Sequence, residues 1–185
     1  MLAGSFRLVT ARLIPRGLRC KQALLWATVI LAGIGSAGCG GSRTAVSAGD
    51  WQTVGGQGFS FEAPAGWKVE RAARRVTATH DSELVQVATF PLLKPYDARL
   101  FARVAVELRS RMRDIAGQTK GRLSGERTVT ADGVRSHAYD VTAGDHVDEY
   151  TFLLNGKREY LLLCRRSSGD GAAACSRLVT SFSRA

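Results

Sequence analysis

Acidic residues are missing from the first 38 positions of this 185-residue chain, although 16 of them follow. The same positions carry five basic residues, then an apolar run at 23–34, then the small residues of 35–38. A basic start, an apolar stretch of about 7–15 residues and small residues at its end make a secretory signal peptide. The run is shorter than the roughly 20 apolar residues that a transmembrane helix needs. We therefore predict a signal peptide over residues 1–38, with an uncleaved anchor as the rival interpretation.

The sequence also lacks the motifs that carry several common chemistries. It has no P-loop, and the glycine-bearing stretch 169–175 (GDGAAAC) lacks a phosphate-binding lysine. It has no Gly-x-Ser-x-Gly elbow of an α/β-hydrolase. Residues 39–185 hold 21 basic and 16 acidic residues, a formal net charge of +5, which is too mild for a nucleic-acid binder. We predict no nucleic-acid partner and no cofactor.

Cysteine is scarce, with four in the chain. Cys20 lies in the predicted signal peptide and would be removed with it. Ala37-Gly38-Cys39 fits the end of a bacterial lipobox, although Ser36 stands where leucine is usual. In a lipobox the cysteine thiol becomes a thioether to diacylglycerol, and the acyl chains then hold the protein on the membrane. We predict that Cys39 is the lipidated N-terminus and that residues 39–57, rich in Gly and Ser, are a flexible tether.

The remaining cysteines, Cys164 and Cys175, lie 11 residues apart in the part predicted to be exported. Disulfides persist in oxidising compartments, whereas a structural zinc site wants four ligands and no second pair lies nearby. We predict a Cys164–Cys175 disulfide that fastens the last helix to the sheet across the polar loop 165–171. In the chain-entropy model a closure of this length stabilises by about 3 kcal/mol.

Alternating apolar and polar residues dominate the sequence after residue 57. This period of two is typical of half-buried strands, and Asn155-Gly156 between two runs indicates a hairpin. The continuous run Leu161-Leu162-Leu163 predicts a central strand that is covered on both faces. The strands are expected at 59–62, 67–70, 75–79, 84–90, 123–130, 134–141, 147–154 and 157–164.

One long stretch, residues 97–116, has the period of a helix. It predicts an amphipathic helix that packs on a sheet; a membrane-surface helix is the alternative, but the polar face carries both signs of charge. A shorter helix is expected at 172–182. The apolar positions of the long helix are Leu100, Val104, Leu108, Met112 and Ile115.

The order of these elements predicts the fold class. Residues 58–185 are expected to form a single α+β domain, an antiparallel β-sheet flanked by helices. The order along the chain is β-block, helix, β-block, helix.

Several short sequence features accompany this order of elements. The segment GFSFEAPAGWKVE, residues 58–70, has a strand that ends at Pro64 and then the pair Gly66-Trp67. The chain closes with REYLLLC and CSRLVTSFS, which place Ser181-Phe182 on the last helix. With the helix between them, these marks resemble the PsbP-like fold over residues 58–184, as found in small bacterial lipoproteins. The resemblance implies a binding, scaffolding or assembly module, and it carries over no catalytic residue.

Two clusters hold side chains that could do chemistry. His80-Asp81-Ser82 has the residue types of a hydrolase triad, but adjacent residues cannot form the triad geometry, so a turn is expected. Residues 145–149, DHVDE, could offer metal ligands. On a strand, His146 and Asp148 share one face while their neighbours take the other, which leaves too few ligands together. We assign no catalytic and no metal-binding residue.

Basic residues gather at two further points, one at Arg71, Arg74 and Arg75 and one at Arg165-Arg166. Either group could contact anionic lipid headgroups beside an anchored domain. Charges of both signs are the norm on protein surfaces, so a solvated face is the expected role of both.

Together these patterns predict an extracytoplasmic protein that is anchored to the cell membrane by the lipid on Cys39. Its domain is expected to be non-enzymatic and to bind an envelope protein or a small ligand. The alternative is an envelope hydrolase or metal-dependent enzyme whose site is assembled from distant residues. Convergent titratable side chains in a pocket would favour the enzyme. A flat or purely apolar groove would favour binding, and an exposed apolar patch on the sheet would favour an assembly factor.

Overall fold

A computed structural model describes residues 50–167 and 171–185 of the chain. The predicted signal peptide, Cys39 and most of the predicted tether lie outside these residues. The strands are β1 Trp51–Gly56, β2 Phe59–Pro64, β3 Lys68–Ala72, β4 Arg75–His80, β5 Glu83–Pro91, β6 Arg122–Ala131, β7 Val134–Ala143, β8 His146–Asn155, β9 Arg158–Ser167 and β10 Ser183–Arg184. The helices are the 3-10 turn η1 Ala98–Leu100, α1 Phe101–Gln118 and α2 Ala172–Ser181.

The strands form two antiparallel sheets. The large sheet has seven strands in the order β3-β4-β5-β9-β8-β7-β6, and the small sheet has the order β1-β2-β10. Strand β9 therefore lies at the centre of the large sheet, as its apolar run predicted. Leu162 is buried, while Leu161 and Leu163 are half-buried, so the cover is complete on one face of β9 and partial on the other.

The expected fold class, an α+β domain with one sheet flanked by helices, is wrong. The described residues are 56% strand and 23% helix, and they include two α-helices. Helix α1 lies nearest to β6 and β7, and its core extends to Tyr150 and Phe152 of β8. Helix α2 packs between the small sheet and β9. The architecture is therefore β-rich, with most of the burial provided by strands.

The small sheet explains much of this difference. Residues 51–56, which the sequence placed in the tether, form β1 and pair with β2 from Trp51↔Pro64 to Gly56↔Phe59. Val54 is 1% exposed in the core. The segment is rich in glycine and has few apolar residues, so its local pattern is weak and its strand depends on the partner β2. Residues 51–56, which precede the expected start at residue 58, are therefore part of the folded domain.

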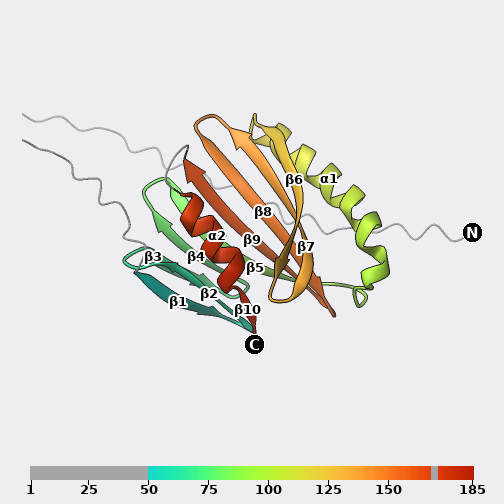
Figure 1. Cartoon of the computed structure of the whole chain (residues 1–185), viewed down its shortest axis with the longest axis horizontal. Coiled ribbons are helices and arrows are strands. Elements are labelled where there is room, and N and C mark those ends of the chain that lie inside the picture. Colours follow the sequence, from blue (N-terminus) through green and yellow to red (C-terminus); the bar gives the residue numbers. More distant parts are fainter. Residues whose placement is uncertain (1–49, 168–170) are drawn as a thin grey trace, which may run out of the picture. The chain divides into compact units, whose positions relative to one another are not determined.

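The two faces of the large sheet carry separate cores; Figure 1 shows the helices and strands that contribute to them. On one face, α2 and the small sheet pack over buried side chains of β4, β5 and β9, among them Val85 and Leu162. On the other face, Leu108 and Met112 of α1 pack on Tyr139 of β7 and its neighbours. All core residues of the described part lie between residues 54 and 182, so a chain that starts at residue 42 keeps both cores.

Two of the hairpin turns of the large sheet can be assigned to a turn type. The β6–β7 turn is Asp132-Gly133, and both residues have positive φ, 48° and 70°, as a type I′ turn requires. The expected Asn155-Gly156 turn is shifted by one residue, because Asn155 pairs with Arg158. Gly156 is then the first central residue, with φ of 54°, where a type II′ turn needs glycine.

The predicted long helix begins with a 3-10 turn. Asp97 caps it, since its Oδ1 accepts a hydrogen bond from the Arg99 N–H at 2.9 Å. The α-helix then runs from Phe101 to Gln118, two residues beyond the expected end. Neither helix of the described part is long and apolar enough to cross a membrane.

Candidate functional site

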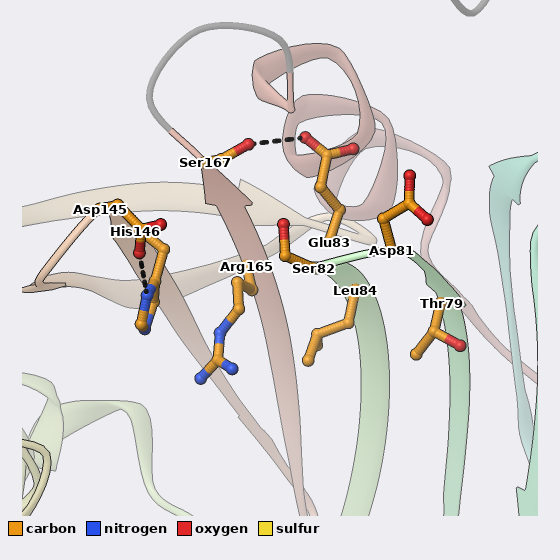
Figure 2. A pocket seen from close by; sticks show the side chains of 9 residues that line it. All are labelled: Thr79, Asp81, Ser82, Glu83, Leu84, Asp145, His146, Arg165 and Ser167. Carbon is orange, nitrogen blue, oxygen red and sulfur yellow. Dashed lines mark hydrogen bonds and ion pairs between the residues drawn. The ribbon is translucent and has the colours of Figure 1, made fainter. Parts of the chain in front are cut away.

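The two clusters that could do chemistry meet at one end of the large sheet (Figure 2). The β4–β5 turn supplies Asp81 and Ser82, and the β7–β8 turn supplies Asp145. His146 is the first residue of β8, and Arg165 comes from β9. They line a cavity of about 230 Å³. The sequence predicted a turn at the first cluster and a strand start at the second. The strand order β4-β5-β9-β8 brings the two clusters to the same end of the sheet.

The geometry of this cavity does not form a hydrolase triad. The Nδ1 atom of His146 lies 3.3 Å from Oδ1 of Asp145, whose side chain is 97% exposed. Within the described part of the chain, no hydrogen bond joins Ser82 to a histidine. A nucleophile needs a base within hydrogen-bonding reach, and among the described residues Ser82 has no such partner.

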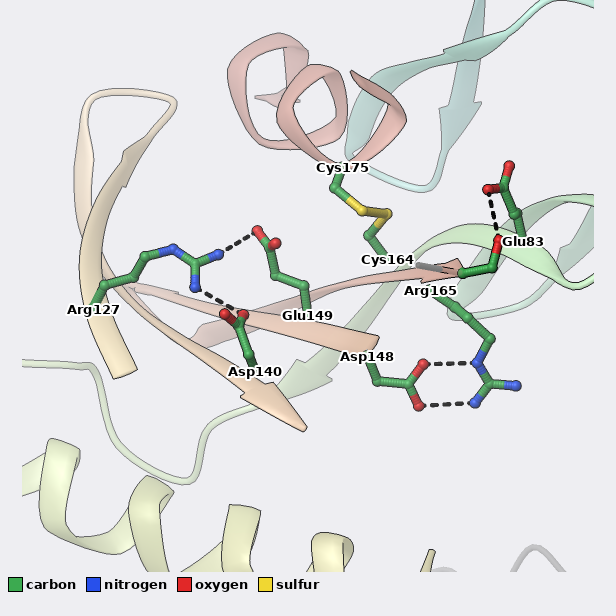
Figure 3. Close-up of a disulfide and its surroundings, with 9 residues drawn as sticks. Glu83, Arg127, Asp140, Asp148, Glu149, Cys164, Arg165 and Cys175 are labelled. Atoms are coloured by element: carbon green, nitrogen blue, oxygen red, sulfur yellow. Dashed lines mark hydrogen bonds and ion pairs between the residues drawn. A yellow bond between two sulfur atoms is a disulfide. The ribbon is translucent and has the colours of Figure 1, made fainter. Parts of the chain in front are cut away.

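The DHVDE segment is divided between the two faces of the sheet, as its alternation predicted. The Asp148 carboxylate, 3% exposed, accepts hydrogen bonds from Nε and Nη2 of Arg165 at 2.7 and 2.8 Å. Glu149 points to the opposite face and pairs with Arg127 at 2.6 Å (Figure 3). Across residues 50–167 and 171–185, no three His, Cys, Asp or Glu side chains gather as a metal site would require.

The Asp148–Arg165 pair also sets the electrostatics beside the cavity. Its hydrogen bonds raise the pKa of the Arg165 guanidinium. Burial raises the pKa of the Tyr150 phenol to about 12, and the negative charge of Asp148 adds to that shift. Arg165 is therefore held in an ion pair with Asp148, whereas the sequence predicted a solvated face for Arg165-Arg166.

A second and larger cavity lies beside α2 on the other face of the sheet. Its volume is about 490 Å³, and strands β6, β8 and β9 form its remaining walls. Val129 and Val179 give it apolar surface, while Glu149 and Arg166 bring opposite charges. We call this cavity the α2 groove. Its lining residues are Val129, Thr130, Glu149, Arg166, Ala172, Cys175, Ser176, Val179 and Thr180.

The predicted disulfide is present and forms part of this wall. Cys164 of β9 and Cys175 of α2 are joined with their Cα atoms 5.3 Å apart (Figure 3). Both residues are buried at 2% exposure. The bond fastens α2 to the central strand, as expected, and so fixes one side of the α2 groove.

A network of ion pairs joins the strands next to the α2 groove. Nη1 of Arg127 donates to Oδ1 of Asp140 at 2.8 Å, and its Nη2 lies 2.6 Å from Glu149. Arg127 thus ties β6 to β7 and β8. The α2 groove could not be predicted from the sequence, because its walls come from four elements that no short motif joins.

The other basic group predicted as a solvated face extends from β3 through the β3–β4 turn to the first residue of β4. Arg71, Arg74 and Arg75 are all exposed. Arg71 Nε donates weakly to the Gly55 carbonyl at 3.4 Å. This placement fits a solvated face.

Comparison with known proteins supports the fold. No protein-family model matches the chain, and no curated protein matches it. The structure is similar to the solution structure of cyanobacterial PsbP (CyanoP) from Synechocystis sp. PCC 6803. The TM-score is 0.58 and the identity 14%, over 81% of this chain and 99% of that one. A crystal structure from Bacteroides thetaiotaomicron is similar with a TM-score of 0.44 and 10% identity, over 75% and 49% of the two chains. The chain therefore has a PsbP-like fold.

Proposed function

We propose that this chain is an exported lipoprotein whose PsbP-like domain binds a partner at the cell envelope and is not an enzyme. The membrane partner is the lipid on Cys39, and the second partner is an envelope protein or a small ligand held in the α2 groove. The observation that carries the proposal is this groove, whose wall includes Cys175 of the disulfide that joins α2 to β9.

The groove has the properties of a binding site. Ligand cavities usually measure about 300–1,000 Å³ and combine apolar walls with a few polar groups. The α2 groove falls within that range at about 490 Å³. Val129 and Val179 supply the apolar contact, and Glu149 and Arg166 supply polar groups for orientation.

The disulfide supports export. Such bonds are rare in reducing compartments and common outside the cytoplasm, and this one joins two buried residues of the core. It agrees with the signal peptide proposed for residues 1–38 and with the lipobox that ends at Cys39.

Photocrosslinking from within the groove tests the proposal. A benzophenone amino acid replaces Ser176, which is exposed on α2 and lines the groove, in the full chain in its native envelope. The matched control replaces Ser110, which is exposed on α1 on the other face of the sheet. We expect a discrete adduct from position 176 that is lost with Thr180→Arg, and none from position 110. Identical adducts from both positions, or none from position 176, would contradict the proposal.

The hydrolase alternative is favoured by one observation, the meeting of Ser82, Asp145 and His146 in the cavity at the sheet end. If that site were catalytic, the purified chain would turn over an ester or phosphoester from a generic panel. Ser82→Ala and His146→Ala would each abolish the turnover. The binding proposal predicts no turnover that these two changes remove.

A further inference from the structure

The connection between β5 and α1 concentrates exposed apolar surface. Four large apolar side chains of the described residues are strongly exposed, and three of them lie at Phe90, Leu93 and Leu100. Their exposed fractions are 40%, 82% and 42%. The connection runs along the end of the large sheet where β8 turns into β9, opposite the Asp145 turn (Figure 1).

This connection is held in place on both sides of Leu93. The Leu92 N–H donates to the Lys157 carbonyl at 2.8 Å, and the Tyr96 N–H donates to the Gly156 carbonyl at 2.7 Å. The β8–β9 turn therefore fixes the backbone that carries Leu93. A side chain presented from a fixed backbone loses little conformational entropy when it docks.

Basic side chains surround the apolar ones. Lys94 and Arg99 lie in the same connection, and Lys157 lies in the turn that holds it. The Arg135 guanidinium stands 4.0 Å from the ring of Phe101, at the start of α1. None of these four basic residues forms an ion pair with another residue of the described ranges.

The carboxylates at this end do not cancel that charge. Glu159 is 8% exposed and pairs with Arg111 at 3.3 Å. Asp132 pairs with Arg184. Asp97 is exposed and caps the η1 turn, so four unpaired cations stand against this one exposed acid.

We infer that Phe90, Leu93, Leu100, Lys94, Arg99, Lys157 and Arg135, the Leu93 patch, dock on an anionic phospholipid surface. Apolar side chains ringed by Lys and Arg match the membrane interface, where the apolar groups enter the acyl boundary and the cations meet phosphates. A protein partner would use the apolar groups equally well, but the uncompensated cations favour a negatively charged surface. This inference does not rest on Cys39, because the patch belongs to the folded domain.

Vesicle sedimentation of residues 42–185, which keep both cores and lack Cys39, tests the inference. One set of vesicles holds equal parts of phosphatidylglycerol and phosphatidylcholine, and the other is pure phosphatidylcholine. We expect binding to the anionic vesicles that weakens as salt is added, and at least tenfold weaker binding to the neutral ones. Lys94→Gln and Lys157→Gln should each lower the partition coefficient about fivefold, from about 1 kcal/mol per cation.

Leu93→Glu is the decisive variant, and Val106→Glu is its matched control. Val106 is also strongly exposed, at 61%, but lies within α1 outside the patch. Leu93→Glu should reduce binding to the anionic vesicles by at least tenfold, while Val106→Glu should stay within twofold of the parent chain; circular dichroism checks that both variants fold. Equal loss in both variants, unchanged binding of Leu93→Glu, or no binding by the parent chain would overturn the inference. The last result would leave the patch to a protein partner.

Discussion

At the scale of single residues, the ion pair between Asp148 and Arg165, beside the cavity at the sheet end, is the contact on which stability should depend most. Asp148 is almost fully buried, and Arg165 is the cation whose two N–H groups neutralise it. A buried carboxylate that loses its partner keeps its desolvation cost without compensation. Stability here should therefore depend more on Arg165 than on arginines in more exposed pairs.

We predict that Arg165→Ala lowers the free energy of unfolding by about 2–4 kcal/mol. Arg165→Lys should lose less, because it keeps the charge but not the two parallel hydrogen bonds. The control is Arg177→Ala, which breaks the more exposed pair with Glu62 and should cost below about 1 kcal/mol. Urea unfolding at neutral pH measures all three. Equal losses in Arg165→Ala and Arg177→Ala would refute the importance given to the buried pair.

A second residue-scale prediction concerns His137 of β7, which is 4% exposed. Its ring stacks on Phe101 with centroids 3.8 Å apart, and Nε2 lies 3.0 Å from the Phe101 carbonyl. Burial lowers the pKa of His137 below its usual 6.5; Glu126 and the Phe101 carbonyl oppose this shift, and Arg135 adds to it. A lowered pKa means that the unfolded chain takes up the proton first as the pH falls.

The stability that His137 contributes is therefore complete above pH 6.5 and falls as the pH drops below that value. His137→Phe keeps an aromatic ring and removes the titration. As the pH falls from 7 to 5, the free energy of unfolding of the parent should decrease relative to that of the variant. If the free energies of unfolding of the two proteins change in parallel with pH, His137 has the same pKa in the folded and unfolded chains, which would contradict the prediction.

At the scale of elements, the disulfide and α2 form one unit. The bond joins α2 to β9, the central strand of the large sheet, while α1 lies on the other face with its own core. Reduction should therefore affect one helix and spare the other. The α2 groove should lose its shape along with α2, because Cys175 is part of its wall.

We expect Cys164→Ala with Cys175→Ala to lower the free energy of unfolding by about 3 kcal/mol, the closure term for a short loop. Amide hydrogen exchange should accelerate in residues 172–181 and remain unchanged in residues 108–116 of α1. Parent protein treated with dithiothreitol is the second arm and should behave like the double variant. Uniform acceleration in both helices would contradict the local role of the bond.

At the scale of the whole molecule, the sequence predicted strand positions well and architecture poorly. Of the eight strands that were expected after residue 57, seven follow the alternating pattern, which local burial sets, and β9 contains the continuous apolar run. The missed strands, β1 and β10, are short or rich in glycine and depend on β2 for pairing. The helix expected at 97–116 does pack on the large sheet, but a helical period says only that one face is buried, not which strands it covers.

The candidate sites show the same limit. Asp81, Ser82, Asp145 and His146 stood out in the sequence, and sheet topology alone placed them around one cavity. The α2 groove and the Leu93 patch were not foreseen. The groove depends on the packing of α2 against β6, and the patch depends on which apolar residues the fold leaves uncovered.

The central claim is that the mature protein begins at a lipidated Cys39 and carries an intact disulfide domain. Mass spectrometry of the chain extracted from its own membranes measures this most directly. We predict a mature chain of residues 39–185, a diacylglycerol thioether on Cys39 and a Cys164–Cys175 bond. Cys39→Ala should leave the membrane after a high-salt wash, which also removes any binding by the Leu93 patch. A membrane-bound chain that retains residues 1–38, or that has a free Cys39 thiol, would contradict the account.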